Sequence, residues 1–182
     1  VCPYWIKDEL GENKYLIAEK DLSSFPKRGD TLMAYTPNTG SVIQDIVVLK
    51  VEKQSSPKDI QEAWNIITLN KSLSDVGLHQ GDNLFPGGEE KLKFTGLYNI
   101  SASGKDYIIR NNTFREQRRF GVLARSSGGL IEGNSFIGVG GSGIFLGNEI
   151  GSFYEGPFPA NTIIRNNTFI NTAWSSIRIT TQ

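Results

Sequence analysis

The heptapeptide Ile108-Ile109-Arg110-Asn111-Asn112-Thr113-Phe114 recurs twice in the second half of the chain. The recurrences are Leu130-Ile131-Glu132-Gly133-Asn134-Ser135-Phe136 and Ile163-Ile164-Arg165-Asn166-Asn167-Thr168-Phe169. The step from Asn112 to Asn134 is one repeat, and the step from Asn134 to Asn167 is longer by half a repeat. A second motif is represented by Val122, Ile144 and Ile177, and the same two sequence separations relate these three residues. The two motifs therefore share one period, the 22-residue repeat, and the third unit is the same unit with half a repeat inserted.

A period of this length, with short apolar pairs, glycine punctuation and no helical stripe, is typical of a solenoid in which each repeat is one coil. The regular leucine spacing of leucine-rich repeats is missing, so the pattern predicts a right-handed parallel β-helix. Equivalent positions would stack about 4.8 Å apart and form columns of like residues. We expect an amide ladder of Asn112, Asn134 and Asn167 at a turn. An aromatic ladder of Phe114, Phe136 and Phe169 is expected inside.

The same stacking predicts which side chains face inward on the second strand of each unit. Val122, Ile144 and Ile177 should point inward, followed by Ala124, Leu146 and Ile179. Leu123, Phe145 and Arg178 should then point outward because side chains alternate along a strand. Glu132 would lie between Arg110 and Arg165 in an alternating charge column, which favours a structural role for this carboxylate.

Composition limits the classes of partner. The formal net charge is zero and the sequence pI is about 6.8, so no electrostatic argument favours nucleic acid or an anionic membrane surface. Cys2 is the single cysteine, which excludes an internal disulfide and a cysteine-based metal cage. No apolar run approaches the roughly 20 residues that span a bilayer. The sequence also lacks a metal-ligand cluster, a phosphate loop and a Ser-His-Asp order, so we expect no cofactor and no metal.

The first half of the chain has a different character. Residues 1–90 lack the 22-residue repeat and contain short alternating or β-branched runs separated by turn residues, which indicates a small antiparallel barrel or sandwich. We expect Leu97-Tyr98-Asn99 to enter the first coil. The predicted fold class is therefore all-β, with a small antiparallel β-barrel-like domain at residues 1–90. A short right-handed parallel β-helix of three or four coils is expected at residues 91–182. Because the chain starts at Val1 without an initiator methionine or a signal-like segment, we expect a processed or truncated piece of a longer protein.

Several of these segments resemble the C-terminal coils of the alpha-1,3-galactosidases of glycoside hydrolase family 110. The segments are residues 98–99, 108–114, 117–123, 131–136, 153–156 and 163–169. The resemblance implies a β-helix interrupted by a small β-barrel, galactosides as substrates and an extracellular or periplasmic location. It also implies that Glu155 matches a family position. Two departures stand out: no paired Asp motif precedes Lys14, and Asn148 replaces an expected Asp.

Glycoside hydrolysis generally needs two carboxylates that flank the scissile bond. Glu149 and Glu155 are the candidate catalytic residues because both lie in the inserted stretch 147–161, and loops on a rigid scaffold often carry sites. Phe153 and Tyr154, together with Phe158, would stack on a sugar ring, with Asn148 beside them. The alternative is a loop that caps the flank of the coil and packs its own aromatic side chains.

Arginines in the first coil and one outward phenylalanine complete the candidate substrate-binding set. Arg118 and Arg125 suit bidentate recognition of a carboxylate or a hydroxyl-rich ligand, although arginine is equally common in solvated turns. Phe145 beside Arg178 is either a sugar platform or a covered strip. The sequence thus predicts a carbohydrate-active, alpha-galactosidase-like protein. The competing function is a non-catalytic glycan-binding or structural module. We expect an uncapped β-helix end to associate with a second copy of the chain.

Overall fold

The structure of the chain is a computed structural model, which describes residues 3–19, 25–36, 41–55, 63–73, 95–148 and 155–180. The chain divides into two compact units, Val1–Ala102 and Ser103–Gln182. Every regular element in the described residues is a β-strand, so the all-β prediction is confirmed. Glu149, Phe153, Tyr154 and His79 lie outside the described residues.

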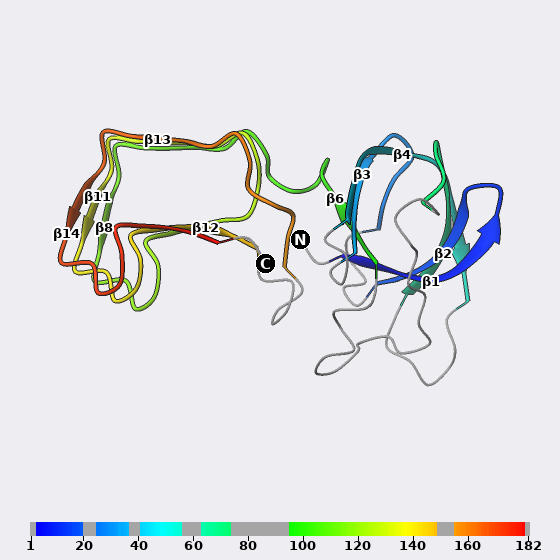
Figure 1. Cartoon of the computed structure of the whole chain (residues 1–182), viewed down its shortest axis with the longest axis horizontal. Helices are drawn as coiled ribbons and strands as arrows, with labels where there is room; N and C mark the ends of the chain where they lie inside the picture. The colour runs from blue at the N-terminus through cyan, green and yellow to red at the C-terminus, as the bar shows by residue number, and fades with distance from the viewer. Residues whose placement is uncertain are drawn as a thin grey trace. The chain divides into compact units, whose positions relative to one another are not determined.

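The first unit is a six-stranded antiparallel barrel (Figure 1). Its strands are β1 (Tyr4–Gly11), β2 (Lys14–Glu19), β3 (Thr31–Thr36), β4 (Ser41–Gln54), β5 (Ala63–Leu69) and β6 (Gly96–Asn99). They close in the order β1-β2-β5-β4-β3-β6. Alternate residues fill the interior, including Tyr15, Leu32, Ile46, Ile67 and Leu97, all of which are fully buried.

Strand β6 differs from the prediction made for it. Leu97-Tyr98-Asn99 was expected to enter the first coil, but Leu97 pairs with Tyr4 of β1 and with Ala34 of β3. The strand completes the barrel because it fills the gap between two antiparallel edges. The boundary between the units accordingly falls after Ala102, later than the expected boundary after residue 90.

The second unit is a parallel β-helix of three described coils, which Figure 1 shows nested on one another. The first coil contains β7 (Ile108–Arg110), β8 (Thr113–Arg115) and β9 (Val122–Ala124). The second contains β10 (Leu130–Glu132), β11 (Ser135–Ile137) and β12 (Ile144–Gly147), and the third β13 (Ile163–Arg165), β14 (Thr168–Ile170) and β15 (Ile177–Thr180). Three sheets result, in the orders β13-β10-β7, β14-β11-β8 and β15-β12-β9.

The register of these sheets confirms the predicted stacking. Ile131 pairs with Ile109 and Ile164, and Ile144 pairs with Val122 and Ile177. The insertion in the third unit therefore leaves the pairing unchanged.

The two predicted ladders are also present. The Asn134 carboxamide oxygen accepts the Asn112 backbone N–H at 2.9 Å, and the Asn167 carboxamide oxygen accepts the Asn134 backbone N–H at 2.9 Å. The Phe136 ring stacks on Phe114 at 4.9 Å and on Phe169 at 5.0 Å between centroids. These columns satisfy turn backbone and fill the core at every coil.

Close contact between coils restricts one position of the first and second coils to glycine. A Cβ added to Gly121 would lie 2.4 Å from a Phe136 ring carbon, and one added to Gly143 would lie 2.6 Å from a Phe169 ring carbon. The equivalent residue of the third coil is Ser176, which is exposed. The glycines thus allow one coil to approach the aromatic ladder of the next.

Candidate functional site

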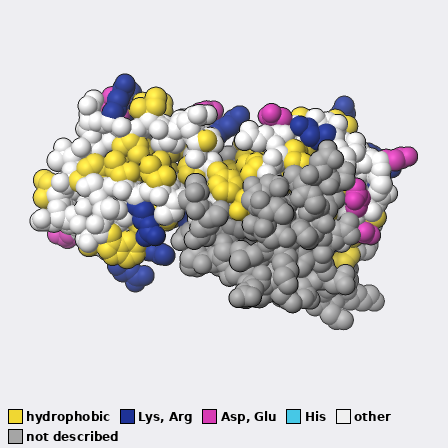
Figure 2. All heavy atoms as spheres, viewed as in Figure 1, with side chains coloured by type: hydrophobic (Ala, Val, Ile, Leu, Met, Phe, Trp, Pro, Cys, Tyr) yellow, Lys and Arg dark blue, Asp and Glu magenta, His cyan; other side chains and the backbone are white. Residues whose placement is uncertain are grey.

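The outer face of the β9-β12-β15 sheet carries a group of aromatic and arginine side chains. The members are Arg119 and Phe120 before β9, Phe145 in β12, Trp174 before β15 and Arg178 in β15. Phe145 pairs in register with Leu123 and Arg178, so all three side chains share the outer face. We call this set of five residues the aromatic–arginine cluster. Figure 2 shows hydrophobic side chains beside Lys and Arg side chains at the lower left of the view, on the β-helix unit.

Ring contacts hold the cluster together. The Phe120 ring lies 4.9 Å from Phe145 and 6.1 Å from Trp174, with interplanar angles of 45° and 74°. The Arg178 guanidinium lies 5.2 Å from the Phe145 centroid and 5.9 Å from the Trp174 centroid, and Arg119 lies 5.1 Å from that of Phe120. These distances are within the range of cation–π attraction. Each aromatic ring therefore has a fixed neighbour.

Exposure within the cluster is unequal. Phe145 is only 5 % exposed, whereas Trp174 is 60 % exposed. Phe120 and Arg178 cover Phe145, so its ring supports the cluster instead of meeting solvent. Of the two interpretations of Phe145, the covered strip describes its position, and Trp174 is the exposed ring of the cluster.

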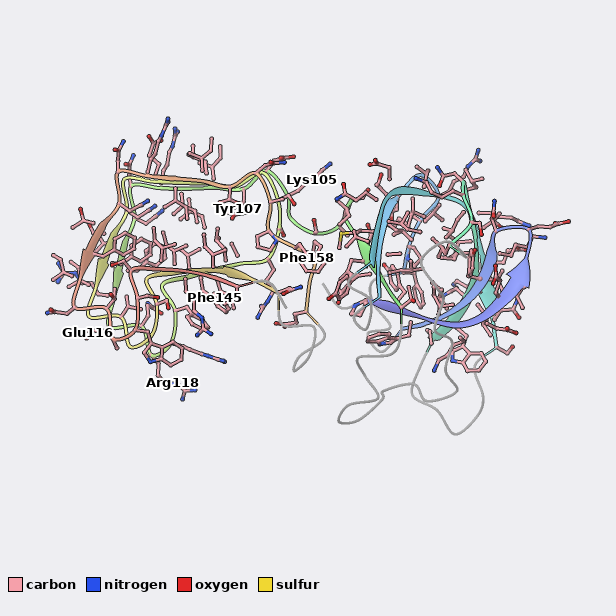
Figure 3. All side chains as sticks on the ribbon, in the orientation of Figure 1. Lys105, Tyr107, Glu116, Arg118, Phe145 and Phe158 are labelled. Carbon is pink, nitrogen blue, oxygen red and sulfur yellow. The ribbon has the colours of Figure 1, made fainter. Side chains whose placement is uncertain are left out.

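Arg118 lies beside this cluster in sequence. It is exposed in the turn that leads from β8 to β9, and Figure 3 labels it on this turn, with Phe145 on the following sheet. The Arg118 carbonyl oxygen would lie 2.7 Å from a Cβ added to Gly140. The backbone at Arg118 is therefore fixed against the second coil, while its side chain reaches solvent.

Arg125 and Glu155 form a separate group. Arg125 follows β9 and its Nη1 lies 2.7 Å from Glu155 Oε2. The Arg125 side chain is mostly buried, and the Glu155 side chain is partly exposed. Asn148 follows β12, the strand that pairs with β9, and is buried. Three predicted site residues thus follow strands of the β-helix: Arg125 follows β9, and Asn148 and Glu155 follow β12. The Glu155 carboxylate forms an ion pair with Arg125.

The structure describes one of the two candidate catalytic carboxylates. Hydrolysis normally uses two carboxylates about 5–9 Å apart on opposite sides of the bond. Glu155 is the one candidate catalytic carboxylate that the structure describes, because Glu149 lies outside the described residues. Glu132, predicted to be structural, accepts a hydrogen bond from Arg165 Nε at 2.7 Å, and Arg110 pairs with it in register on the other side.

Trp174 and Phe120 were not selected from the sequence, although the repeat contains a signal for Trp174. The steps that relate the heptapeptides also place Trp174 in one column with Gly141 and Arg119. The Trp174 backbone N–H donates to the Gly141 carbonyl oxygen at 3.3 Å, which agrees with that column. Extending the repeat beyond the strands therefore places Trp174 in the column that contains Arg119, with Gly141 between them.

Metal-binding and membrane-spanning features are missing from the part of the chain that the structure describes. Those residues contain no group of three or more His, Cys, Asp and Glu side chains placed to hold a metal ion. Among them there is also no helix long and apolar enough to cross a membrane.

Comparison with known proteins gives one result for the second half of the chain. A family model described as a right handed beta helix region matches residues 80–182, which is more than half of the chain. No curated protein matches the sequence. The match agrees with the three parallel sheets that the stacked coils form.

Proposed function

This chain belongs to the right-handed β-helix family, and on that scaffold we propose a carbohydrate-binding function for the aromatic–arginine cluster. The observation that carries the proposal is the exposed Trp174 ring, held in place by Phe120 and Arg178. The C–H face of a pyranose is apolar and packs on such a ring, while its hydroxyl groups need donors and acceptors at the edge. Arg119 and Arg178 supply several N–H donors within the cluster. Exposed aromatic side chains grouped with arginine are typical of recognition surfaces.

The proposed ligand class follows from the resemblance to the alpha-1,3-galactosidases of glycoside hydrolase family 110. We propose galactosides as the first ligands to test, and an extracellular or periplasmic location as the setting in which the chain meets them. Binding without turnover is the proposed activity, because the ion pair with Arg125 occupies Glu155. Hydrolysis would require a second carboxylate at the spacing given above.

The direct test is a calorimetric titration of the full chain with galactose and galactose-containing oligosaccharides. Trp174→Ala should reduce the affinity about tenfold or more, since loss of a stacking ring removes roughly 1–3 kcal/mol. Arg178→Ala should also weaken binding, and Arg178→Lys should restore only part of it because lysine lacks the planar fork. Ile170→Ala is the matched control, because Ile170 is an exposed apolar residue of the same coil on a different sheet.

A second measurement separates the binding module from the enzyme. The chain should not release the leaving group from an aryl alpha-galactoside. Turnover that Glu155→Gln abolishes would contradict the proposal and establish a hydrolase. Affinity that is the same in Trp174→Ala and in the Ile170→Ala control would contradict the role of the cluster.

We also propose self-association through the third coil. Ile177 and Ile179 face inward in register with Ile144 and Leu146, yet they are 41 % and 67 % exposed. A second copy that covers these side chains would bury apolar surface as stacked coils do. Light scattering at micromolar concentration tests this, and a dimer that Ile179→Lys dissociates is the expected result. A monomer at all concentrations would contradict it.

A further inference from the structure

The barrel unit has a pocket that the proposed sugar site does not use. It is formed by the segment before β3, by the second half of β4 and by one residue of β5. Its lining residues are Phe25, Pro26, Lys27, Arg28, Leu49, Lys50, Val51, Lys53 and Asn65.

Backbone hydrogen bonds fix the wall of this pocket. The Gly29 N–H donates to the Val48 carbonyl oxygen at 2.8 Å, and the Val48 N–H donates to the Asp30 carbonyl oxygen at 3.0 Å. The Asp30 carboxylate accepts the Lys27 backbone N–H at 2.9 Å, which closes the turn. Gly29 has a φ of +91°, a conformation that favours glycine. The loop that carries Lys27 and Arg28 is therefore tied to β4.

The described lining is strongly basic. Four of its residues are cations (Lys27, Arg28, Lys50 and Lys53), and none is acidic. Glu52 pairs with Lys50 at 2.9 Å, which leaves Lys27, Arg28 and Lys53 as the lining cations without a carboxylate partner among the described residues, and the Asp30 carboxylate accepts Asn99 Nδ2 at 2.7 Å. The net charge of the chain is zero, so this concentration of positive charge is local. A concave basic surface attracts anions.

The pocket lining also contains one buried amide side chain and several apolar side chains. Asn65 is only 3 % exposed, and it alternates along β5 with the core residues Ile67 and Leu69. In the β4–β5 register it lies opposite Lys53. Phe25, Pro26 and Val51 add apolar surface. A pocket with an apolar wall and a few polar groups is a common place for a small ligand.

We propose that this barrel pocket binds a small ring compound that carries a phosphate or sulfate group, such as a phosphorylated or sulfated monosaccharide. Lys27, Arg28 and Lys53 neutralise the oxyanion, because lysine binds such groups as a point charge and arginine as a planar fork. The ring packs between Phe25 and Val51, and the Asn65 amide binds a ring hydroxyl. The proposal is independent of Trp174 and of the β-helix unit.

The test uses the full chain and four probes: glucose 6-phosphate, glucose 6-sulfate, inorganic phosphate and glucose. Calorimetry or ligand-observed NMR should show binding of at least one of the two esters at millimolar concentration, weakening as salt screens the charges. The two esters distinguish a phosphate source from a sulfate source. Glucose should not bind, and inorganic phosphate should bind more weakly than the preferred ester because it lacks the ring.

Charge-matched variants make the result specific. Arg28→Gln combined with Lys53→Gln should weaken ester binding about tenfold or more, since both substitutions remove a charged contact to the oxyanion. Lys105→Gln combined with Arg115→Gln removes the same charge from exposed positions of the other unit and should leave binding unchanged. Trp174→Ala should also leave ester binding unchanged, so either proposal can be contradicted while the other holds. Equal affinities of the pocket and control variants, or no binding of either ester, would overturn the proposal.

Discussion

The second and third coils of the β-helix share one heptapeptide pattern but differ in the burial of its side chains. Phe136 of the second coil is fully buried, whereas Phe169 of the third is half-buried. Ile144 is fully buried, and its register partner Ile177 is exposed. The same local sequence therefore specifies the same strand and turn, while the number of neighbouring coils determines how much each side chain stabilises the fold.

The largest expected difference concerns the aromatic ladder. Phe136→Ala should lower the free energy of unfolding of the β-helix unit by about 3–5 kcal/mol, because it removes a buried ring that contacts rings on both sides. Phe169→Ala should cost clearly less, since Phe169 has one recorded ring neighbour. Hydrogen exchange of the peptides from residues 103–180 measures both. Equal losses of protection would show that the coils are energetically equivalent.

The asparagine ladder gives the next effect. Asn134 Nδ2 donates to the Ile109 carbonyl oxygen at 2.9 Å, and Asn134 Oδ1 accepts the Asn112 backbone N–H. Asn134→Leu leaves both backbone groups without that partner, at a cost of roughly 1–3 kcal/mol for each buried group left unpaired. Asn112 is exposed, so Asn112→Leu should cost less. A thermal unfolding midpoint unchanged in Asn134→Leu would refute the role of the ladder.

Exchanging the glycine and serine of equivalent positions tests the contact between coils. Gly143→Ser should destabilise the unit on the order of 1 kcal/mol, because the new Cβ would meet the Phe169 ring and the Ser176 carbonyl oxygen. Ser176→Gly should have little effect beyond the small entropic cost of glycine. Urea denaturation of both variants measures the difference. The reverse order of stabilities would contradict the inferred close approach.

The smallest effect is expected for the charge column. The Glu132 and Arg165 side chains are 26 % and 57 % exposed, and exposed ion pairs contribute about 0.2–1 kcal/mol. Glu132→Gln should therefore change stability within this range and less so at high salt. A double-mutant cycle with Arg165→Gln isolates the pair. A loss comparable to that of Phe136→Ala would mean that Glu132 has a role other than this column.

The sequence predicted the features that repeat. Two motifs with common steps determine the register, so the Asn112–Asn134–Asn167 and Phe114–Phe136–Phe169 columns follow from the residue pattern alone. Strand β6 was assigned incorrectly because a short apolar run fits a coil and a barrel strand equally well, and only pairing with β1 and β3 distinguishes them.

The candidate site was less accessible from the sequence, because its contacts join residues that no repeat relates. The alternation of side chains along β12 predicted that Phe145 faces outward. The ring that packs over Phe145 belongs to Phe120, which lies in a turn. The partner of Glu155 is Arg125, which precedes it in the chain by more than one full repeat. The barrel pocket combines the loop before β3 with side chains of the two strands that follow β3. None of these distances is encoded in a local pattern.

The connection between β12 and β13 has a consequence for how such a chain diversifies. It is longer by half a repeat than its counterpart between β9 and β10, yet Ile144 pairs with Ile177 as it does with Val122. Chain length at this corner is thus uncoupled from the architecture, because the strands on either side are positioned by their neighbours and not by the segment that joins them. Insertions at this corner are a route by which a β-helix acquires new surface chemistry while its core sequence stays constant.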